Sequence, residues 1–194
     1  MGRRAEVKRR TRETEVAVTL ELDGSGRYQV DTGIGFFDHM LSLVAKHGLL
    51  DLEVRARGDL EVDYHHTVED VGICMGEALK GALGEARGIR RFASALLPMD
   101  EALAMMALDI SGRPFLVYKV GLAGKVGDFD LELAEVFFRG FSTHGAVTLH
   151  VNLLYGRNLH HCCEALFKGF GLLLREATRL EPRLEGPPST KGVL

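Results

Sequence analysis

The motif His-His-x-x-Glu occurs twice in this chain of 194 residues, at 65–69 and at 160–164. Each copy opens an apolar run with helical spacing. A polar motif repeated at the start of two similar helices is typical of a fold made of two related halves. Imidazole and carboxylate side chains at this spacing are also typical of metal ligands. The sequence therefore predicts a duplicated fold that binds metal.

Two further matches support the duplication and keep its order along the chain. LDGSGR at 22–27 matches LDISGR at 108–113, an offset of 86 residues (113 − 27). KHG at 46–48 matches THG at 143–145, an offset of 97 (144 − 47), and the His-His-x-x-Glu copies lie 95 apart (160 − 65). The glycine-rich insertion 121–127 accounts for most of the increase in offset from 86 to 97 residues. We expect a first half at 1–92 and a second half with a C-terminal tail at 93–194, fused into a single domain.

Hydrophobic periodicity predicts the same order of elements in both halves. Strands are expected at 15–22, 27–30, 50–56 and, briefly, 60–62, with helices at 36–46 and 68–86. In the second half they are expected at 102–110, 115–120 and 147–154, with helices at 131–143 and 162–178. The Gly-containing segments at 23–26 and 111–114 predict hairpin turns between the first two strands of each half. The expected class is α+β, with internally duplicated ββαβα units in which helices cover one face of each sheet.

Composition limits the function classes. The formal net charge of -3 lacks the excess of positive charge that is typical of nucleic-acid-binding proteins. No apolar run reaches the roughly 18 residues of a membrane span. The basic start, 1–12, lacks the apolar region of a secretory signal, and we expect it to be frayed and solvated, with an irregular tail after Arg179. The cysteines Cys74, Cys162 and Cys163 are odd in number, which argues against disulfides and favours a cytoplasmic protein. Cys162 and Cys163 are interpreted as small packing residues.

Helical geometry divides each motif between two faces. Residues four apart share a face, so His65 and Glu69 can bind one ion. The adjacent His66 points about 100° away around the helix axis and need not bind the same ion. The second copy repeats this arrangement with His160, Glu164 and His161. We therefore expect two ions, each drawing on both halves or on neighbouring subunits, and a ligand set without thiolate suits Mn, Fe, Zn or Ni.

A single pair of adjacent histidines is usually an ordinary surface or core pair. Two pairs, each followed by Glu between a strand and a helix, favour the ligand interpretation.

The remaining histidines are weaker candidates. His39 is a further candidate ligand, and the offset of 97 aligns it with Val136, which cannot bind metal. His47 and His144 each precede a Gly that ends a helix, where the helix dipole alone favours a histidine. His150, on a strand, is expected to be structural.

Five segments together resemble the imidazoleglycerol-phosphate dehydratase family, and the resemblance runs from about Glu13 to the last residue. The segments are FFDHML at 36–41, DYHHTVED at 63–70, PMDEA at 98–102, DISGRP at 109–114 and STKGVL at 189–194. The resemblance implies a lyase of histidine biosynthesis that removes water from D-erythro-imidazole-glycerol phosphate to give imidazole-acetol phosphate. It also implies two manganese ions per active site and a homo-oligomer of 24 subunits, with sites at subunit contacts.

The resemblance also assigns roles to residues. Metal ligands would be His39, His65, His66, Glu69, His160, His161 and Glu164. The reaction would fall to Glu13, His66, Glu69, His161 and Glu164, with Glu13 at the substrate, where it would help to move protons. The pocket would be lined by Glu13, His47 and Lys168, and the phosphate would be held by Arg91, Arg113, Ser189 and Lys191. Arginine, lysine and hydroxyl groups suit a phosphate dianion. Without the resemblance, these four would be surface arginines beside turns and residues of an irregular tail.

Two positions depart from the family. Val136 stands where the family usually has a histidine ligand, and Tyr64 stands where it commonly has Asp. One ion is therefore expected to have fewer protein ligands. His144 lies two helical turns beyond Val136, about 11–12 Å along the axis, which is too far for direct rescue.

Two rival functions stay open. A metal-binding assembly protein without catalysis would use the same ligands, as would a different metal hydrolase. The phosphate-type residues Arg91, Arg113, Lys168 and Lys191 favour the enzyme over the first rival. The lack of a clear Asp-rich set of bridging carboxylates weighs against the second.

Overall fold

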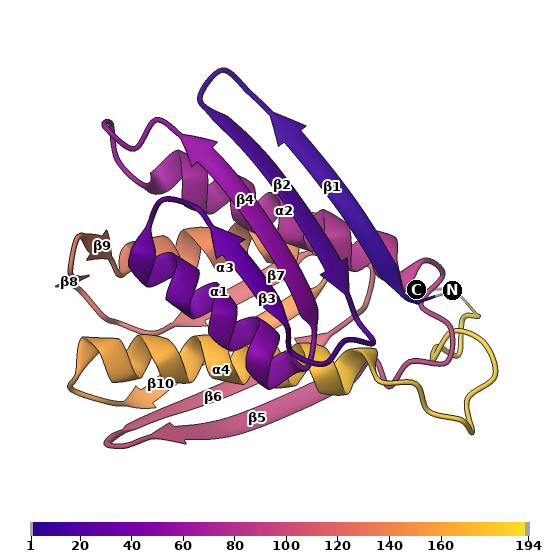
Figure 1. Ribbon diagram of the computed structural model, residues 1–194. Coiled ribbons are helices and arrows are strands. Elements are labelled where there is room, and N and C mark those ends of the chain that lie inside the picture. The colour runs from indigo at the N-terminus through magenta and orange to yellow at the C-terminus, as the bar shows by residue number, and fades with distance from the viewer. Residues whose placement is uncertain (1, 193–194) are drawn as a thin grey trace.

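The computed structural model describes residues 2–192 and arranges them as two four-stranded sheets with four long helices between them (Figure 1). The first half contains β1 (Arg4–Arg10), β2 (Thr14–Glu21), β3 (Tyr28–Asp31), α1 (Gly35–Gly48), β4 (Asp51–Gly58) and α2 (His65–Leu83). The second half contains β5 (Phe92–Met99), β6 (Ala102–Asp109), β7 (Phe115–Lys119), β8 (Lys125–Val126), β9 (Phe129–Asp130), α3 (Glu132–Gly145), β10 (Thr148–Tyr155) and α4 (Leu159–Thr178). The α+β class with two similar sheet–helix halves is confirmed. Residues 193 and 194 of the closing segment lie outside the described range.

Both sheets have the same topology. The strand orders are β1-β2-β4-β3 and β5-β6-β10-β7, and only the last pair of each sheet is parallel. The hairpins predicted around 23–26 and 111–114 are therefore wrong. The chain does turn there, but β3 and β7 pair with the strand that follows the next helix. The place beside β2 goes to β4, because its alternating Leu52, Val54 and Ala56 align with the buried residues of β2.

The first strand of each sheet was missed in the sequence. β1 pairs with β2 along its whole length, so the prediction of a frayed start is wrong. Its inward residues Ala5 and Val7 pack against the core, while alternate charged residues face solvent and give the segment its solvated character. β5 contains Pro98, which an edge strand tolerates because one side of it needs no ladder hydrogen bonds. The short strand predicted at 60–62 is instead a turn closed by Val62 N and Asp59 O.

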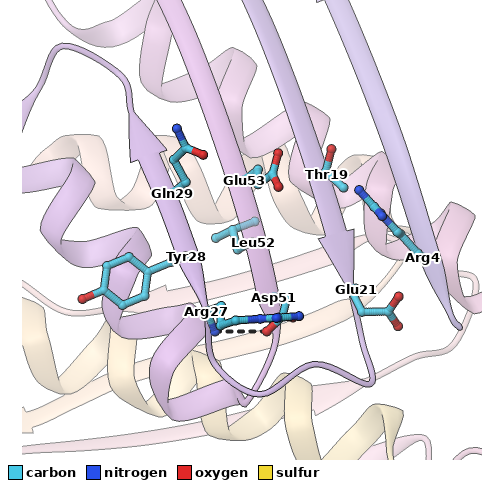
Figure 2. Close-up of a pocket in the computed structure, with 9 residues that line it drawn as sticks. All are labelled: Arg4, Thr19, Glu21, Arg27, Tyr28, Gln29, Asp51, Leu52 and Glu53. Carbon is cyan, nitrogen blue, oxygen red and sulfur yellow. Dashed lines mark hydrogen bonds and ion pairs between the residues drawn. The ribbon is translucent and has the colours of Figure 1, made fainter.

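The outer faces of the two sheets differ in chemistry. On the first sheet, cross-strand rows join charged and polar residues; the row through Arg4, Glu21 and Asp51 lines a shallow pocket with Arg27 (Figure 2). On the second sheet, Leu96 lies beside Met105 and Phe115 beside Thr148. The side chains of Leu96, Met105 and Phe115 are exposed. The two halves therefore share a backbone plan but not an outer surface.

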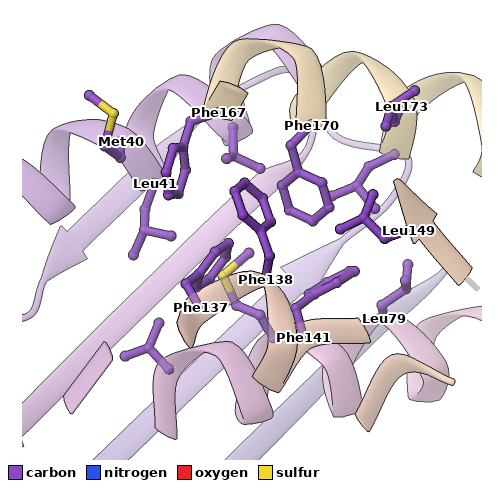
Figure 3. Packing of buried hydrophobic residues seen from close by; sticks show 14 of the residues in the cluster. Met40, Leu41, Leu79, Phe137, Phe138, Phe141, Leu149, Phe167, Phe170 and Leu173 are labelled. Carbon is purple, nitrogen blue, oxygen red and sulfur yellow. The ribbon is translucent and has the colours of Figure 1, made fainter. Parts of the chain in front are cut away.

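The helices meet in a phenylalanine-rich core. α1 and α2 contact the first sheet, α3 and α4 contact the second, and the layers join through α1 with α4 and α2 with α3. Five buried rings from α3 and α4 contact one another in edge-on, tilted and stacked pairs (Figure 3). They are Phe137, Phe138, Phe141, Phe167 and Phe170. This packing joins α3 to α4, the helix that begins with the second histidine motif.

Close helix contacts make the duplication visible in three dimensions. A Cβ at Gly171 of α4 would lie 2.6 Å from Val44 O of α1, and a Cβ at Gly76 of α2 would lie 2.5 Å from Phe141 O of α3. Gly76 and Gly171 are 95 residues apart, the same offset as the histidine motifs. The pair α1–α4 therefore corresponds to the pair α3–α2. The segment 121–131, which begins with the glycine-rich insertion 121–127, carries the small β8–β9 hairpin beside the start of α3.

Three expectations from the sequence concern membrane spans, the cysteines and the C-terminal tail. In the described part of the chain, no helix combines the length and the hydropathy that a membrane span requires. The three cysteines are free and buried, in agreement with their interpretation as packing residues. The tail after Arg179 is irregular, as predicted, and is tied to the loop after α2 by Gly88 N and Gly186 O.

Candidate metal centre and phosphate pocket

His39, His160 and Glu164 form a three-residue cluster across the two halves. His39 Nε2 lies 2.8 Å and His160 Nε2 lies 3.1 Å from Glu164 Oε1. One ligand atom from each side chain lies within 4.8 Å of the others, and this is the one such group among the described residues. The i, i+4 spacing on α4 aligns His160 with Glu164, and the close packing of α1 on α4 brings His39 to them. The donor set fits a divalent cation of the Mn, Fe, Zn or Ni type.

Glu164 is held as a carboxylate in this cluster. Its side chain is only 9% exposed, and Lys168 Nζ donates a 2.6 Å hydrogen bond to Oε2. Burial alone would raise the pKa of Glu164, but hydrogen bonds from Lys168, His39 and His160 outweigh it and lower the pKa to about 2. Glu164 therefore carries the negative charge that a cation requires.

The first motif has only part of this arrangement. His65 and Glu69 lie one turn apart at the exposed start of α2. The position that corresponds to His39 is Val136 on α3, which packs against α2. A Cβ at Gly140, one turn beyond Val136, would lie 3.0 Å from Glu69 O, so this side of α3 faces α2. His65 and Glu69 therefore lack a counterpart of His39, because valine cannot bind a metal ion.

The other two motif histidines point away, as helical geometry predicts. The rings of His65 and His66 are inclined by 81°, and those of His160 and His161 by 85°. His66 Nδ1 lies 3.0 Å from Asp59 Oδ2, and His161 Nδ1 lies 2.8 Å from Glu101 Oε2. The hydrogen bonds that the imidazoles donate to these carboxylates raise the pKa of both rings.

The two carboxylates Asp59 and Glu101 are functional candidates that the sequence did not reveal. Asp59 follows β4, and Glu101 lies in the β5–β6 turn inside the PMDEA segment. Sequence spacing does not show that either loop folds back onto a helix start. Glu13, which was predicted at the substrate, lies in the β1–β2 turn, with Oε2 3.8 Å from His66 Nδ1.

All four residues predicted to hold the phosphate line one pocket. Arg91, Arg113, Ser189 and Lys191 line it together with Ser111, Gly112, Pro188 and Thr190. Arg91 is fixed there because its Nε donates to Asp109 Oδ1 at 2.7 Å and its Nη1 donates to Pro188 O at 2.9 Å. Arg113 is largely exposed and can turn toward a ligand. Ser111 was missed, although it lies within the DISGRP segment.

The remaining predicted pocket residues lie near the three-residue cluster. Lys168 is one turn beyond Glu164 and also contacts Met99 Sδ at 3.3 Å. Burial and the charge of Lys168 lower the pKa of His47, which favours the neutral form of that imidazole. His144 donates from Nδ1 to Gly140 O at 3.0 Å within its own helix, the local role expected of a C-terminal histidine. His150 lies on the exposed face of β10.

Comparisons with known proteins agree with this geometry. The model of the imidazoleglycerol-phosphate dehydratase family matches residues 32–174. Imidazoleglycerol-phosphate dehydratase from Acetivibrio thermocellus is 55% identical over all of both chains. The enzyme from Caldanaerobacter subterraneus subsp. tengcongensis is 58% identical over 99% of this chain and 100% of its own.

Solved structures show the same fold. Imidazoleglycerol-phosphate dehydratase from Staphylococcus aureus superposes with a TM-score of 0.83 at 36% identity, covering 92% of this chain and 99% of its own. The Pyrococcus furiosus enzyme in complex with (S)-C348 gives the same TM-score and identity over 97% and 100%. The chain therefore belongs to the imidazoleglycerol-phosphate dehydratase family, the metal-dependent hydro-lyases of histidine biosynthesis.

Proposed function

We propose that the family's reaction, the dehydration of D-erythro-imidazole-glycerol phosphate to imidazole-acetol phosphate, takes place here at sites completed by more than one copy of the chain. The observation that carries this proposal is the separation of two features on α4. Glu164 lies near its start, whereas Ala177 O, near its end, accepts a hydrogen bond from the backbone N of Arg91, whose side chain lines the phosphate pocket. Thirteen residues of helix span about 20 Å. The three carbons between the substrate's imidazole and phosphate are too short to bridge that span within one chain.

The proposed ion is Mn²⁺, with two per active site. Imidazole and carboxylate ligands without thiolate suit it. His39, His160 and Glu164 would hold one ion, while His65 and Glu69 would contribute to a second, weaker centre; His66 and His161 would supply ligands from other faces. A bound divalent ion supplies Lewis acidity, which draws electron density from the substrate's imidazole and eases loss of the hydroxyl group.

The chain's own residues bind the substrate and move the proton. Arg91, Arg113 and Lys191 match the phosphate dianion in charge, and Ser189 adds a hydroxyl donor. Glu13 is 56% exposed at its side chain and close to His66, so it is placed to take or return a proton. His47 and Lys168 line the side of α4 next to Glu164. The reaction is thus assigned to Glu13 with the ligand groups His66, Glu69, His161 and Glu164. A purely structural metal site would have no use for the phosphate pocket.

The proposed assembly is a 24-subunit homo-oligomer in the cytoplasm. The outer face of the second sheet supports self-association: the exposed fractions are 59% for Phe92, 62% for Leu96 and 61% for Phe115. Apolar side chains gathered on one sheet face are typical of a surface that a protein partner covers. Free, buried cysteines fit a reducing compartment.

Mixed oligomers test the shared site. Arg113→Ala and His160→Ala should each abolish most turnover of imidazole-glycerol phosphate in the presence of Mn²⁺. Unfolding the two variants together and refolding them as mixed assemblies should restore part of the activity, because some sites then pair an intact phosphate pocket with an intact metal cluster. Separately refolded variants, mixed afterwards without subunit exchange, are the control. Mixed assemblies that stay as inactive as either parent would contradict the proposal.

A further inference from the structure

Each motif histidine that turns away from its neighbour has a carboxylate at the same ring nitrogen. His161 Nδ1 lies 2.8 Å from Glu101 Oε2, and His66 Nδ1 lies 3.0 Å and 3.2 Å from the two oxygens of Asp59. A carboxylate can only accept a hydrogen bond, so Nδ1 must carry the proton in both rings. In the neutral imidazole, Nε2 then has the free lone pair and is the one atom able to bind a cation.

The carboxylate of Glu101 is itself held in place. Its Oε1 accepts hydrogen bonds from Arg157 N at 3.1 Å and from Asn158 N at 2.6 Å, just before α4. Because Oε1 meets these two N–H donors and Oε2 faces His161 Nδ1, the carboxylate acts as the acceptor at all three contacts. The β5–β6 turn is thereby fastened to the start of the helix that carries His160 and His161. Asp100 Oδ2 lies on the other side of the ring, 3.7 Å from His161 Nε2, and is too far for a hydrogen bond.

The two halves use carboxylates from different places in the fold to hydrogen-bond the Nδ1 of their motif histidine. β5 and β6 begin 88 residues after β1 and β2 (92 − 4 and 102 − 14), so Glu101 corresponds to Glu13 in the β1–β2 turn. Glu101 hydrogen-bonds its histidine, whereas Glu13 remains 3.8 Å from His66. In the first half, Asp59 makes the hydrogen bond instead.

We propose that Glu101 and Asp59 are positioning residues that fix His161 and His66 as Nδ1–H tautomers with Nε2 presented to a cation, and that Asp59 releases Glu13 from this task. Carboxylates that orient metal-binding imidazoles in this way commonly change metal affinity by about 10–100-fold when lost. The inference rests on the proposed ligand roles of His66 and His161. It also explains why Glu13, unlike its counterpart Glu101, is free to act on the substrate.

Glu101→Gln is the sharpest test in the second half. The amide oxygen can keep the bonds from Arg157 N and Asn158 N, which turns the amide NH₂ toward His161 Nδ1. That nitrogen must then accept, and the proton moves to Nε2, where it blocks ligation. We expect Mn²⁺ affinity, measured by equilibrium dialysis on the chelator-stripped protein, to fall by about 10–100-fold. In ¹⁵N-histidine spectra of the metal-free assembly, one histidine should change from the Nδ1–H to the Nε2–H tautomer.

Asp59→Ala tests the first half independently, with Glu61→Ala as its matched control. Glu61 is an exposed carboxylate in the same turn, and no hydrogen bond or ion pair joins it to another of residues 2–192. We expect Asp59→Ala to weaken Mn²⁺ binding tenfold or more, and Glu61→Ala to leave it unchanged. Glu13→Gln should lower turnover while leaving Mn²⁺ affinity intact, in contrast to its counterpart Glu101→Gln.

His161→Ala distinguishes the proposed ligand role of His161 from the proposed positioning role of Glu101 and Asp59. If this variant binds Mn²⁺ like the parent, the proposed ligand role is at fault. If it loses affinity while Glu101→Gln and Asp59→Ala keep both their affinity and their Nδ1–H tautomers, the positioning role is overturned.

Discussion

His39 Nε2 lies 2.8 Å from Glu164 Oε1, and this contact joins residues 125 positions apart, one from each half of the duplicated chain. His39 stands on α1 and Glu164 on α4, helices that approach so closely that only glycine fits at Gly171. The candidate metal centre is therefore a product of helix packing between the halves. Its geometry depends on that packing as much as on the ligands.

Loss of His39 should remove one of the three side chains of this cluster. His39→Ala is expected to lower the affinity of one ion per subunit by at least about tenfold, because two ligands remain and Glu164 loses a hydrogen-bond donor. Bound metal after dialysis is the measurement. His144→Ala, which removes a histidine bonded to its own helix, should leave the metal content unchanged. Equal metal content in both variants would exclude His39 from the site.

Val136→His should complete the cluster of His65 and Glu69. The substituted imidazole would occupy the position on α3 that His39 occupies on α1, so the weaker ion is expected to bind more tightly, by about tenfold or more. Manganese titration followed by electron paramagnetic resonance measures the change. Glu135→His, one residue earlier on the same helix, is the control because its side chain projects about 100° away. An unchanged titration for Val136→His would show that this position does not face the site.

The apolar outer face of the second sheet should be required for assembly. Leu96→Glu places a charge beside Met105 in the middle of that face, and we expect the large oligomer to dissociate into smaller species during sedimentation. Lys8→Glu changes the corresponding fifth residue of β1, on the charged face of the first sheet, and serves as the matched control. Dissociation of the Lys8→Glu variant alone would mean that the outer face of the first sheet, and not that of the second, is required for assembly.

Asp51 should make the stability of the first sheet depend on acid. Its carboxylate accepts hydrogen bonds from Ser25 N at 2.8 Å and Arg27 N at 3.0 Å and pairs with the Arg27 guanidinium (Figure 2). The Arg27 hydrogen bond holds the pKa of Asp51 well below its usual value of 3.8. A lowered pKa means that the stabilisation is complete above about pH 4 and is lost as the pH falls below that value.

Asp51→Asn is therefore expected to cost about 1–3 kcal/mol of unfolding free energy at pH 7. The difference from the parent should shrink as the pH is lowered from about 4. Denaturant unfolding of the metal-free protein at several pH values measures it. Asp63→Asn is the control, because Asp63 accepts one backbone hydrogen bond and has no guanidinium partner among the described residues. A pH-independent difference would mean that Asp51 acts through packing.

Local elements were largely predictable because their signals are local. Apolar residues at helical spacing gave the four helices, and α2 and α4 begin within three residues of the predicted start. Strand pairing was not predictable in the same way. The turn after β2 was recognised, but the partner of β3 is β4, which lies beyond a whole helix. β1 was missed because its outward charges outnumber its inward apolar residues in the sequence.

The sequence by itself determined the duplication, the family and the split of each motif between two helix faces, because these follow from repeated residues and from the fixed pitch of a helix. Tertiary structure alone decided which side chains meet. It brought His39 to Glu164, gathered Arg91, Arg113, Ser189 and Lys191 into one pocket, and placed Asp59 and Glu101 against their histidines. The physical reason is that these contacts join segments far apart in the chain, so their geometry is set by helix and sheet packing and leaves no local trace in the residue order.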